Sequence, residues 1–252
     1  MNFRASPFLR LLPVLLLTHA AFAENAPIPP EQRAAMIASF EKTRTEATDA
    51  LAKEPASTEW LSRRGDVRLF LGDAKGAVAD FEKEIALDAS HDAPHWRLGI
   101  ACLFAGEFAK SAKQFEKYHA YDGHDRENGV WQFFANARVV GVEKARTQML
   151  EYTRFDREPF PAIYEMLAGK KTGAEVLAEM EKKGLGEDAL VMFFAHYYIG
   201  LNEDLLGHRT AAREHLAKAV ALVVKSGARG GPGYMGHVAR LHYEAMPLAP
   251  GK

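Results

Sequence analysis

Residues 65–88 read GDVRLFLGDAKGAVADFEKEIALD, and residues 99–122 read GIACLFAGEFAKSAKQFEKYHAYD. The two segments begin 34 residues apart, and similar residues recur at equivalent positions. The shared positions are Gly65 and Gly99, Leu69 and Leu103, Gly72 and Gly106, Phe81 and Phe115, and Asp88 and Asp122. A fixed period of this length predicts a chain of helical hairpins, because one hairpin cannot bury its apolar face alone and stacks on the next.

Small and aromatic residues that recur with this period are the signature of tetratricopeptide repeats. We therefore expect an all-α fold, a tetratricopeptide-type α-solenoid of stacked helical hairpins over residues 57–252. Its expected parts are clear repeats at 58–91, 92–125 and 193–226, degenerate hairpins at 127–183, and a capping helix at 234–245 that shields the end of the stack. No segment shows the alternation of apolar and polar residues that predicts a strand.

The first 23 residues have the pattern of a signal peptide rather than of a folded element. Arg4 and Arg10 form a basic start, and Leu11–Leu17 is a short apolar core. Small residues then precede an expected cleavage site between Ala23 and Glu24, which predicts a periplasmic or secreted protein. The apolar run is too short to span a bilayer, so no stable membrane anchor is expected; the alternative is a retained anchor.

Residues 24–56 form an N-terminal extension that contains one expected helix, at about 31–53. Ile37, Phe40 and Leu51 lie on one apolar face of that helix, and no obvious hairpin partner follows it in the sequence. Two interpretations stay open. The helix either caps the first repeat or packs on a second copy of itself, which would give a homodimer through residues 31–53.

Composition and charge exclude some classes of function. The formal net charge is −1, whereas a nucleic-acid-binding surface needs a strong excess of basic residues. The only cysteine, Cys102, rules out an internal disulfide framework in an exported protein. We expect Cys102 to be a small apolar residue of a helix interior.

Ten histidines raise the question of a metal site. His91 and His95 lie four residues apart, but Pro94 and an expected turn separate them from a continuous helix face. His237 and His242 lie five residues apart, a poor spacing for one metal on a helix. We expect no metal and no cofactor. The alternative is a metal-dependent hydrolase, or another enzyme, that uses one of these two histidine pairs.

The concave surface of a tetratricopeptide array is lined mainly by the first helix of each repeat. The corresponding side chains are Asp66 and Phe70 in the first repeat, Trp96, Ile100 and Phe104 in the second, and Tyr197 and Leu201 in the last. An aromatic and aliphatic groove with an acidic edge suits an extended or helical peptide of a protein partner. The competing interpretation is that the aromatic residues are core between adjacent repeats.

Three stretches outside the clear repeats resemble the family of the bacterial lipoprotein NlpI. They are residues 131–135 (WQFFA) followed by 142–145 (VEKA), residues 163–169 (IYEMLAG) followed by 174–177 (AEVL), and residues 196–200 (HYYIG) with the final HVAR at 237–240. The resemblance implies an all-helical periplasmic adaptor, usually a homodimer, that brings cell-wall hydrolases to synthesis complexes or to a processing protease. Members of that family are lipidated, whereas this chain has no lipobox cysteine.

Taken together, the pattern and the resemblance predict a non-catalytic, exported adaptor or scaffold. It would bind protein partners through its concave groove and would act in the cell envelope, in a role related to peptidoglycan hydrolases.

Overall fold

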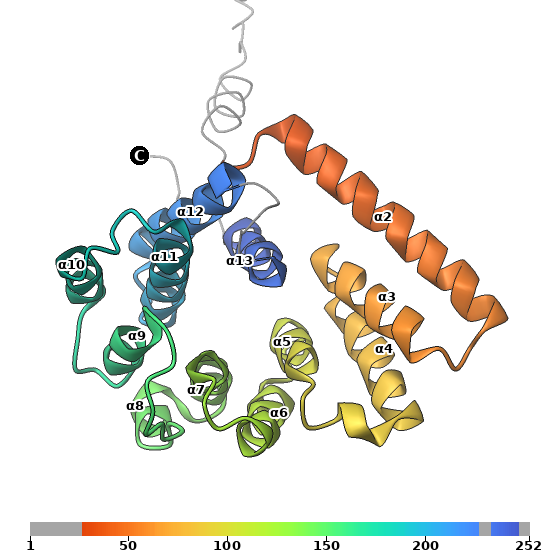
Figure 1. Ribbon diagram of the computed structural model, residues 1–252, viewed down its shortest axis with the longest axis horizontal. Helices are drawn as coiled ribbons and strands as arrows, with labels where there is room; N and C mark the ends of the chain where they lie inside the picture. The colour runs from red at the N-terminus through yellow and green to blue at the C-terminus, as the bar shows by residue number, and fades with distance from the viewer. Residues whose placement is uncertain (1–26, 227–232, 247–252) are drawn as a thin grey trace, which may run out of the picture.

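The computed structural model describes residues 27–226 and 233–246, which form an all-helical protein (Figure 1). The expected signal peptide, residues 1–23, lies outside the described residues. Within them there are twelve α-helices, one 3-10 turn and no strand. The helices are α2 (Pro30–Lys53), α3 (Thr58–Phe70), α4 (Ala74–Leu87), α5 (Trp96–Phe104), α6 (Phe108–Tyr121), α7 (Arg126–Val140), α8 (Val142–Arg146), α9 (Phe160–Leu167), α10 (Gly173–Lys182), α11 (Ala189–Leu205), α12 (Arg209–Ser226) and α13 (Tyr234–Ala245), with the 3-10 turn η1 (Ala89–His91) after α4.

Neighbouring helices pack in pairs, and three pairs repeat one contact. Helix α3 packs on α4, α5 on α6, and α11 on α12. In each pair a glycine of the first helix lies against a large side chain sixteen residues later, on the second helix. A Cβ atom would lie 2.4 Å from Phe81 at Gly65, 2.7 Å from Phe115 at Gly99 and 2.9 Å from Leu216 at Gly200. The recurring residues of the sequence are therefore the ones that let the paired helices approach closely.

The turns inside these three hairpins also share one geometry. Gly72, Gly106 and Gly207 have φ angles of 88°, 79° and 85°, a region that side chains with a Cβ atom rarely adopt. The next backbone amide then bonds the carbonyl five residues earlier, as from Asp73 to Arg68. This is the Schellman ending of a helix, which satisfies carbonyls that would otherwise lack partners.

The middle of the chain, expected as degenerate hairpins, consists of helices of unequal length. Helix α7 packs on α6 and on the five-residue α8, and the short α9 packs on both α10 and α11. Helix α10 begins with a capping box: the Thr172 hydroxyl accepts from the Glu175 amide, and the Glu175 carboxylate accepts from the Thr172 amide. These shorter helices keep the chain turning between the regular hairpins.

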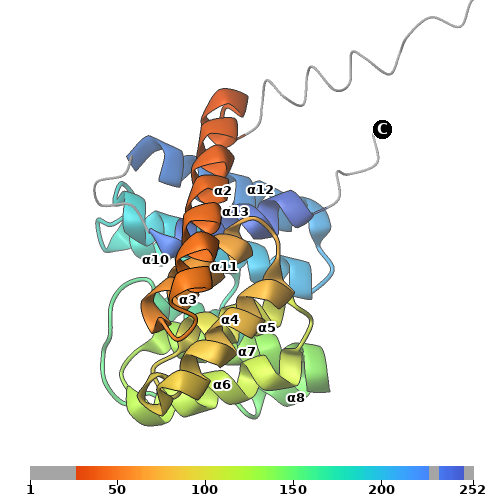
Figure 2. The same ribbon diagram turned by 90° about the vertical axis from the view of Figure 1, so that its right-hand side faces the viewer.

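Two helices complete a ring-like arrangement (Figure 1). Helices α3 to α12 follow an arc, and α2 runs as one long rod along the side of the molecule, packed on α3 (Figure 2). Helix α2 also reaches α13: Arg33 forms an ion pair with Glu244 at 2.6 Å. Helix α2 therefore has partners within the same chain, and its buried residues are Ala47 and Leu51.

Helix α13, expected as the cap of the stack, lies in the middle of the ring (Figure 1). It packs on α12 and on α3, and its side chains also contact rings of α2, α5, α7 and α11. Val238 and Ala239 are fully buried, and Arg240 nearly so. An interior position fits its composition, since it carries two tyrosines and two histidines that an exposed cap would leave in water.

Candidate functional site

The predicted groove residues come from α3, α5 and α11. Four of them, Phe70, Ile100, Tyr197 and Leu201, are at most 8% exposed and belong to the hydrophobic core. Helix α13 contacts the rings of four of the predicted residues. Those four are Phe70, Trp96, Phe104 and Tyr197. The concave face of the array therefore already holds a helix, and that helix belongs to the chain itself.

The first turn of α13 binds through aromatic contacts. The Tyr234 ring packs edge-on against Phe70 and against Trp96, with centroid distances of 4.8 Å in both cases. His237 follows one turn later and packs against Phe70 at 4.6 Å and edge-on against Phe40 of α2 at 4.9 Å. Contacts of this geometry contribute about 0.5–1.5 kcal/mol each beyond the area that they bury.

The last turn of α13 binds through His242. Its ring lies 4.4 Å from the Phe104 ring and stacks on Trp131 at 6.2 Å. Its Nδ1 atom is 2.9 Å from the hydroxyl oxygen of Tyr197, a side chain that is fully buried. Trp131, from α7, thus belongs to this face too, although the sequence pattern placed α7 among the degenerate hairpins.

Both histidines of α13 are held in the neutral form. Burial lowers the pKa of His242 from 6.5 to about 3, and a smaller effect of the same sign comes from Arg138. Burial also lowers the pKa of His237 to about 4, helped by Arg240 on the same helix. A protonated imidazole at either position would lose its hydration and would be surrounded by aromatic rings. Because these rings do not replace the lost hydration, the neutral form is favoured.

Polar contacts fix the position of α13 along the ring. The guanidinium of Arg240, 2% exposed, donates through Nη2 to the carbonyl oxygen of Phe70, the last residue of α3. Its Nη1 atom donates to Glu244 at 2.8 Å, and Glu244 also accepts from Arg33 of α2. One carboxylate thus joins a buried and an exposed arginine, and it links α13 to both α2 and α3.

The remaining predicted residue, Asp66, forms an acidic edge that is already paired. Arg97 of α5 donates to Asp66 at 2.7 Å and to the Ser62 hydroxyl at 2.7 Å. Burial raises the pKa of Asp66 to about 6, although Arg97 acts in the opposite direction. This ion pair connects the first helices of two successive hairpins.

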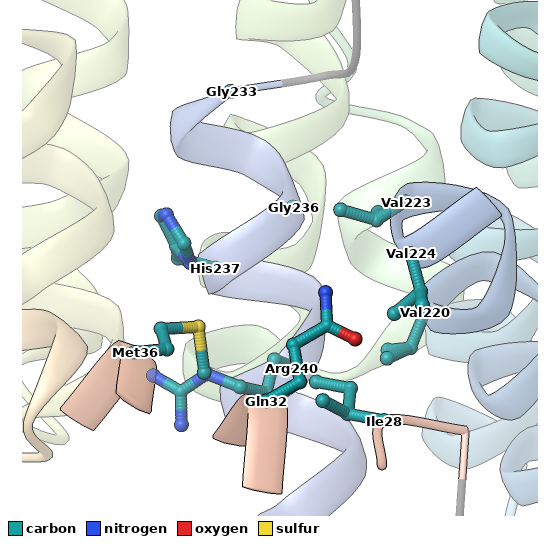
Figure 3. Close-up of a pocket in the computed structure, with 10 residues that line it drawn as sticks. All are labelled: Ile28, Gln32, Met36, Val220, Val223, Val224, Gly233, Gly236, His237 and Arg240. Carbon is teal, nitrogen blue, oxygen red and sulfur yellow. The ribbon is translucent and has the colours of Figure 1, made fainter. Parts of the chain in front are cut away.

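A groove lies beside α13, between that helix, α2 and α12 (Figure 3). Its volume is about 390 Å³. Val220 and Val224 of α12 and Met36 of α2 face it from opposite sides, and Gly236 of α13 leaves space between them (Figure 3). We call this concavity the α2/α12/α13 groove. It offers apolar surface directly along the helix that fills the middle of the ring.

The two histidine pairs considered as metal ligands lie in different surroundings. His237 and His242 contact different sets of rings, as described above. His91 and His95 both approach Glu84, at 3.0 Å and 3.3 Å, and His95 Nδ1 accepts the Leu98 amide as the N-cap of α5. In the described part of the chain, no group of three or more His, Cys, Asp or Glu side chains has an arrangement that suits a metal ion.

These observations define the class of the molecule: an all-helical protein of paired helices, whose inner face carries an aromatic surface that binds a helix. Scanned against models of protein families, the chain matches none, and no curated protein matches it either. Among residues 27–226 and 233–246, no helix is both long enough and apolar enough to cross a membrane.

Proposed function

We propose that the protein is a non-catalytic adaptor of the tetratricopeptide-repeat type, and that it binds a helical segment of a protein partner on the face now covered by α13. The observation that carries the proposal is the occupation of that face by an amphipathic helix. A surface that accepts one helix through Phe70, Trp96, Phe104 and Tyr197 has the shape and chemistry to accept another.

The partner segment would resemble α13 in its chemistry. It would present aromatic or apolar side chains one turn apart, as Tyr234 and His237 do, and a polar group near the Tyr197 hydroxyl, as His242 does. The α2/α12/α13 groove gives an incoming segment an apolar surface beside the helix that it must displace. Displacement makes the binding competitive, so the apparent affinity for a partner falls as α13 docks more tightly.

The place of action belongs to the same proposal. The basic and apolar start of the chain, with small residues before Glu24, supports export. The resemblance to the NlpI family supports a role in the cell envelope, with partners related to peptidoglycan hydrolysis. The single cysteine of this sequence, Cys102, lies within α5, and we propose a periplasmic or secreted adaptor.

The test compares variants of the full-length protein by chemical crosslinking in intact cells, followed by mass spectrometry of the captured partners. Tyr234→Ala removes two ring contacts of α13 and leaves Phe70, Trp96, Phe104 and Tyr197 unchanged. The docking of α13 should weaken by about 2 kcal/mol, which raises partner capture by up to roughly 30-fold. Adding Trp96→Ala should cancel the gain, because Trp96 belongs to the aromatic face that binds α13 or the partner helix.

Glu179→Ala is the matched control. Glu179 lies on α10 and forms ion pairs with Lys171 and Lys183, and it takes part in none of the ring contacts of α13. Its capture of partners should equal that of the wild type. Folding of every variant is checked by thermal unfolding. The proposal is wrong if hydrogen exchange shows that Tyr234→Ala releases α13 while partner capture stays unchanged, or if Trp96→Ala does not reduce it.

A further inference from the structure

A second cavity lies inside the ring, at the start of α13 and on the side of α7. Its volume is about 360 Å³. The walls combine aromatic rings with polar side chains of one turn. They are Trp96, Phe115, Trp131 and Tyr234, together with Asp125, Glu127, Asn128 and Met235. Four aromatic rings and two carboxylates in one cavity are more than packing of adjacent helices requires.

The carboxylates near this cavity outnumber the cations that pair with them. Arg157 approaches Asp125 at 3.4 Å, Glu127 at 2.6 Å and Asp156 at 3.1 Å. The side chain of Arg126 turns instead to the carbonyl oxygens of residues 152 and 154. Three carboxylates thus share one guanidinium. The Oδ2 atom of Asp125 takes part in none of these contacts.

One buried acceptor of the cavity wall has no hydrogen-bond partner. It is Oδ1 of Asn128, a residue that is 2% exposed and whose amide nitrogen already donates to the Phe115 carbonyl. The Tyr234 hydroxyl, in contrast, lies near Asp66 and Arg97. An unsatisfied buried acceptor costs about 1–3 kcal/mol, so Asn128 Oδ1 indicates a donor that occupies the cavity.

The chemistry of the walls selects the class of ligand. An anion would meet an excess of carboxylates, and an apolar molecule would leave Asn128 Oδ1 without a donor. A divalent metal would need a cluster of ligands that the described residues do not provide. An ammonium group suits both kinds of side chain in this cavity. It donates hydrogen bonds to carboxylate and amide oxygens, and it is attracted by the faces of aromatic rings.

We propose that this cavity binds an alkylammonium group, held by Asp125 and Asn128 and covered by the rings of Trp96 and Tyr234. At the ~30 Å³ that one water molecule occupies in the liquid, the space admits roughly ten non-hydrogen atoms. That is enough for a short primary amine or for the side chain of a lysine. The shared chemistry is the ammonium group, and the source is either a free amine or a protein partner.

The protonation of Glu127 adds a dependence on pH. Burial raises the pKa of Glu127 to about 7, while the Tyr198 hydroxyl of α11 and Arg157 act in the opposite direction. The other charged groups that face it are Asp125 and Asp156. A bound cation favours the ionised carboxylate, so binding should tighten as the pH rises from 6 to 8.

Calorimetric titration of the full chain with n-butylammonium at pH 8 tests the site, with 1-butanol as the neutral probe. Saturable binding of the amine is expected, and 1-butanol should not compete. Asp125→Asn keeps the N-cap of α7, because asparagine caps as well as aspartate, but removes one charge. We expect it to weaken amine binding about tenfold, as we do for Trp96→Leu, since a cation–π contact contributes up to about 2 kcal/mol.

Asp122→Asn is the matched control. It removes the same charge from the preceding turn, where Asp122 Oδ1 accepts from the His124 amide, and should leave amine binding unchanged. A peptide with one lysine, compared with the same peptide with alanine, distinguishes the sources. Binding of the lysine peptide assigns the group to a protein partner, and binding of the free amine alone assigns it to a small molecule. Absence of saturable binding by both, or equal effects of Asp125→Asn and Asp122→Asn, overturns the proposal.

Discussion

Acidification should release helix α13 from the ring. The helix is held by two neutral histidines whose pKa values are lowered in the folded protein, to about 4 for His237 and about 3 for His242. In the released helix both return to about 6.5. A lowered pKa means that docking is fully favourable above pH 6.5 and is weakened progressively as the pH falls through that value toward the pKa of the docked form.

The magnitude follows from the difference in protonation. At pH 5 the released form of each histidine is 1.5 pH units below its pKa, whereas the docked form is still neutral. Each therefore lowers the free energy of docking by about 2 kcal/mol, and the two together by about 4 kcal/mol. The groups that face these rings reinforce the effect. Arg240 and Arg138 are positive, and the surrounding side chains of α2, α3, α5 and α7 are aromatic.

Hydrogen exchange with mass spectrometry measures the release directly. Amides of α13 should lose protection by roughly a thousandfold between pH 7.5 and pH 5, after correction for the intrinsic pH dependence of exchange. His237→Phe separates the contributions, because a phenylalanine ring can keep the packing on Phe40 and Phe70 but cannot be protonated. This variant should dock normally at pH 7.5 and lose about half of the pH dependence.

His208→Gln is the control, since His208 is exposed at the turn between α11 and α12 and contacts Glu203. Burial also lowers the pKa of His196, to about 4, and that of His215, and the Nδ1 atoms of these two residues lie 2.9 Å apart between α11 and α12. Their effect would appear in α11 and α12 and would persist in the His237→Phe variant. The reasoning is refuted if α13 is as protected at pH 5 as at pH 7.5, or if His237→Phe keeps the full pH dependence.

Two further predictions concern the hairpins. Gly99→Ala should lower the free energy of unfolding by about 1 kcal/mol in urea, because overpacking against Phe115 exceeds the gain in helix propensity, and the cost should shrink in a Phe115→Leu background. Asp80→Ala should cost about 3 kcal/mol in thermal or urea unfolding, because the buried Asp80 accepts from both Arg64 and Arg68; an unchanged stability would contradict this assignment.

The hairpins could be predicted from sequence because their determinants are local. A glycine and a large residue sixteen positions apart define one hairpin, as do Gly65 and Phe81, and the glycine of the turn marks where the first helix ends. The predicted all-helical fold and the predicted burial of Cys102 are both confirmed in the described residues. Both also depend on local sequence patterns. Helix-length repeats encode contacts between neighbours, which are read from spacing alone.

The place of α13 could not be predicted, because it depends on contacts between distant residues. Arg240 binds the carbonyl of Phe70, and Tyr234 meets Trp96, yet no period relates these pairs. A repeat pattern fixes how each hairpin meets the next but leaves the total curvature undetermined. The aromatic and histidine content of residues 234–245 could have indicated a buried helix. A helix exposed at the end of a stack would leave these four rings in contact with water.

An occupied inner face changes what partner binding requires. Only residues 227–232 separate α12 from the N-cap of α13, so the released helix stays near its site at an effective concentration in the millimolar range or above. A partner helix with the same intrinsic affinity but a micromolar concentration would lose the competition. It succeeds only if it makes additional contacts, as along the α2/α12/α13 groove, or if docking of α13 is weakened first. A loss of about 4 kcal/mol on acidification would raise the apparent affinity for a partner by up to about a thousandfold, so the two histidines of α13 would set the conditions under which the proposed adaptor binds.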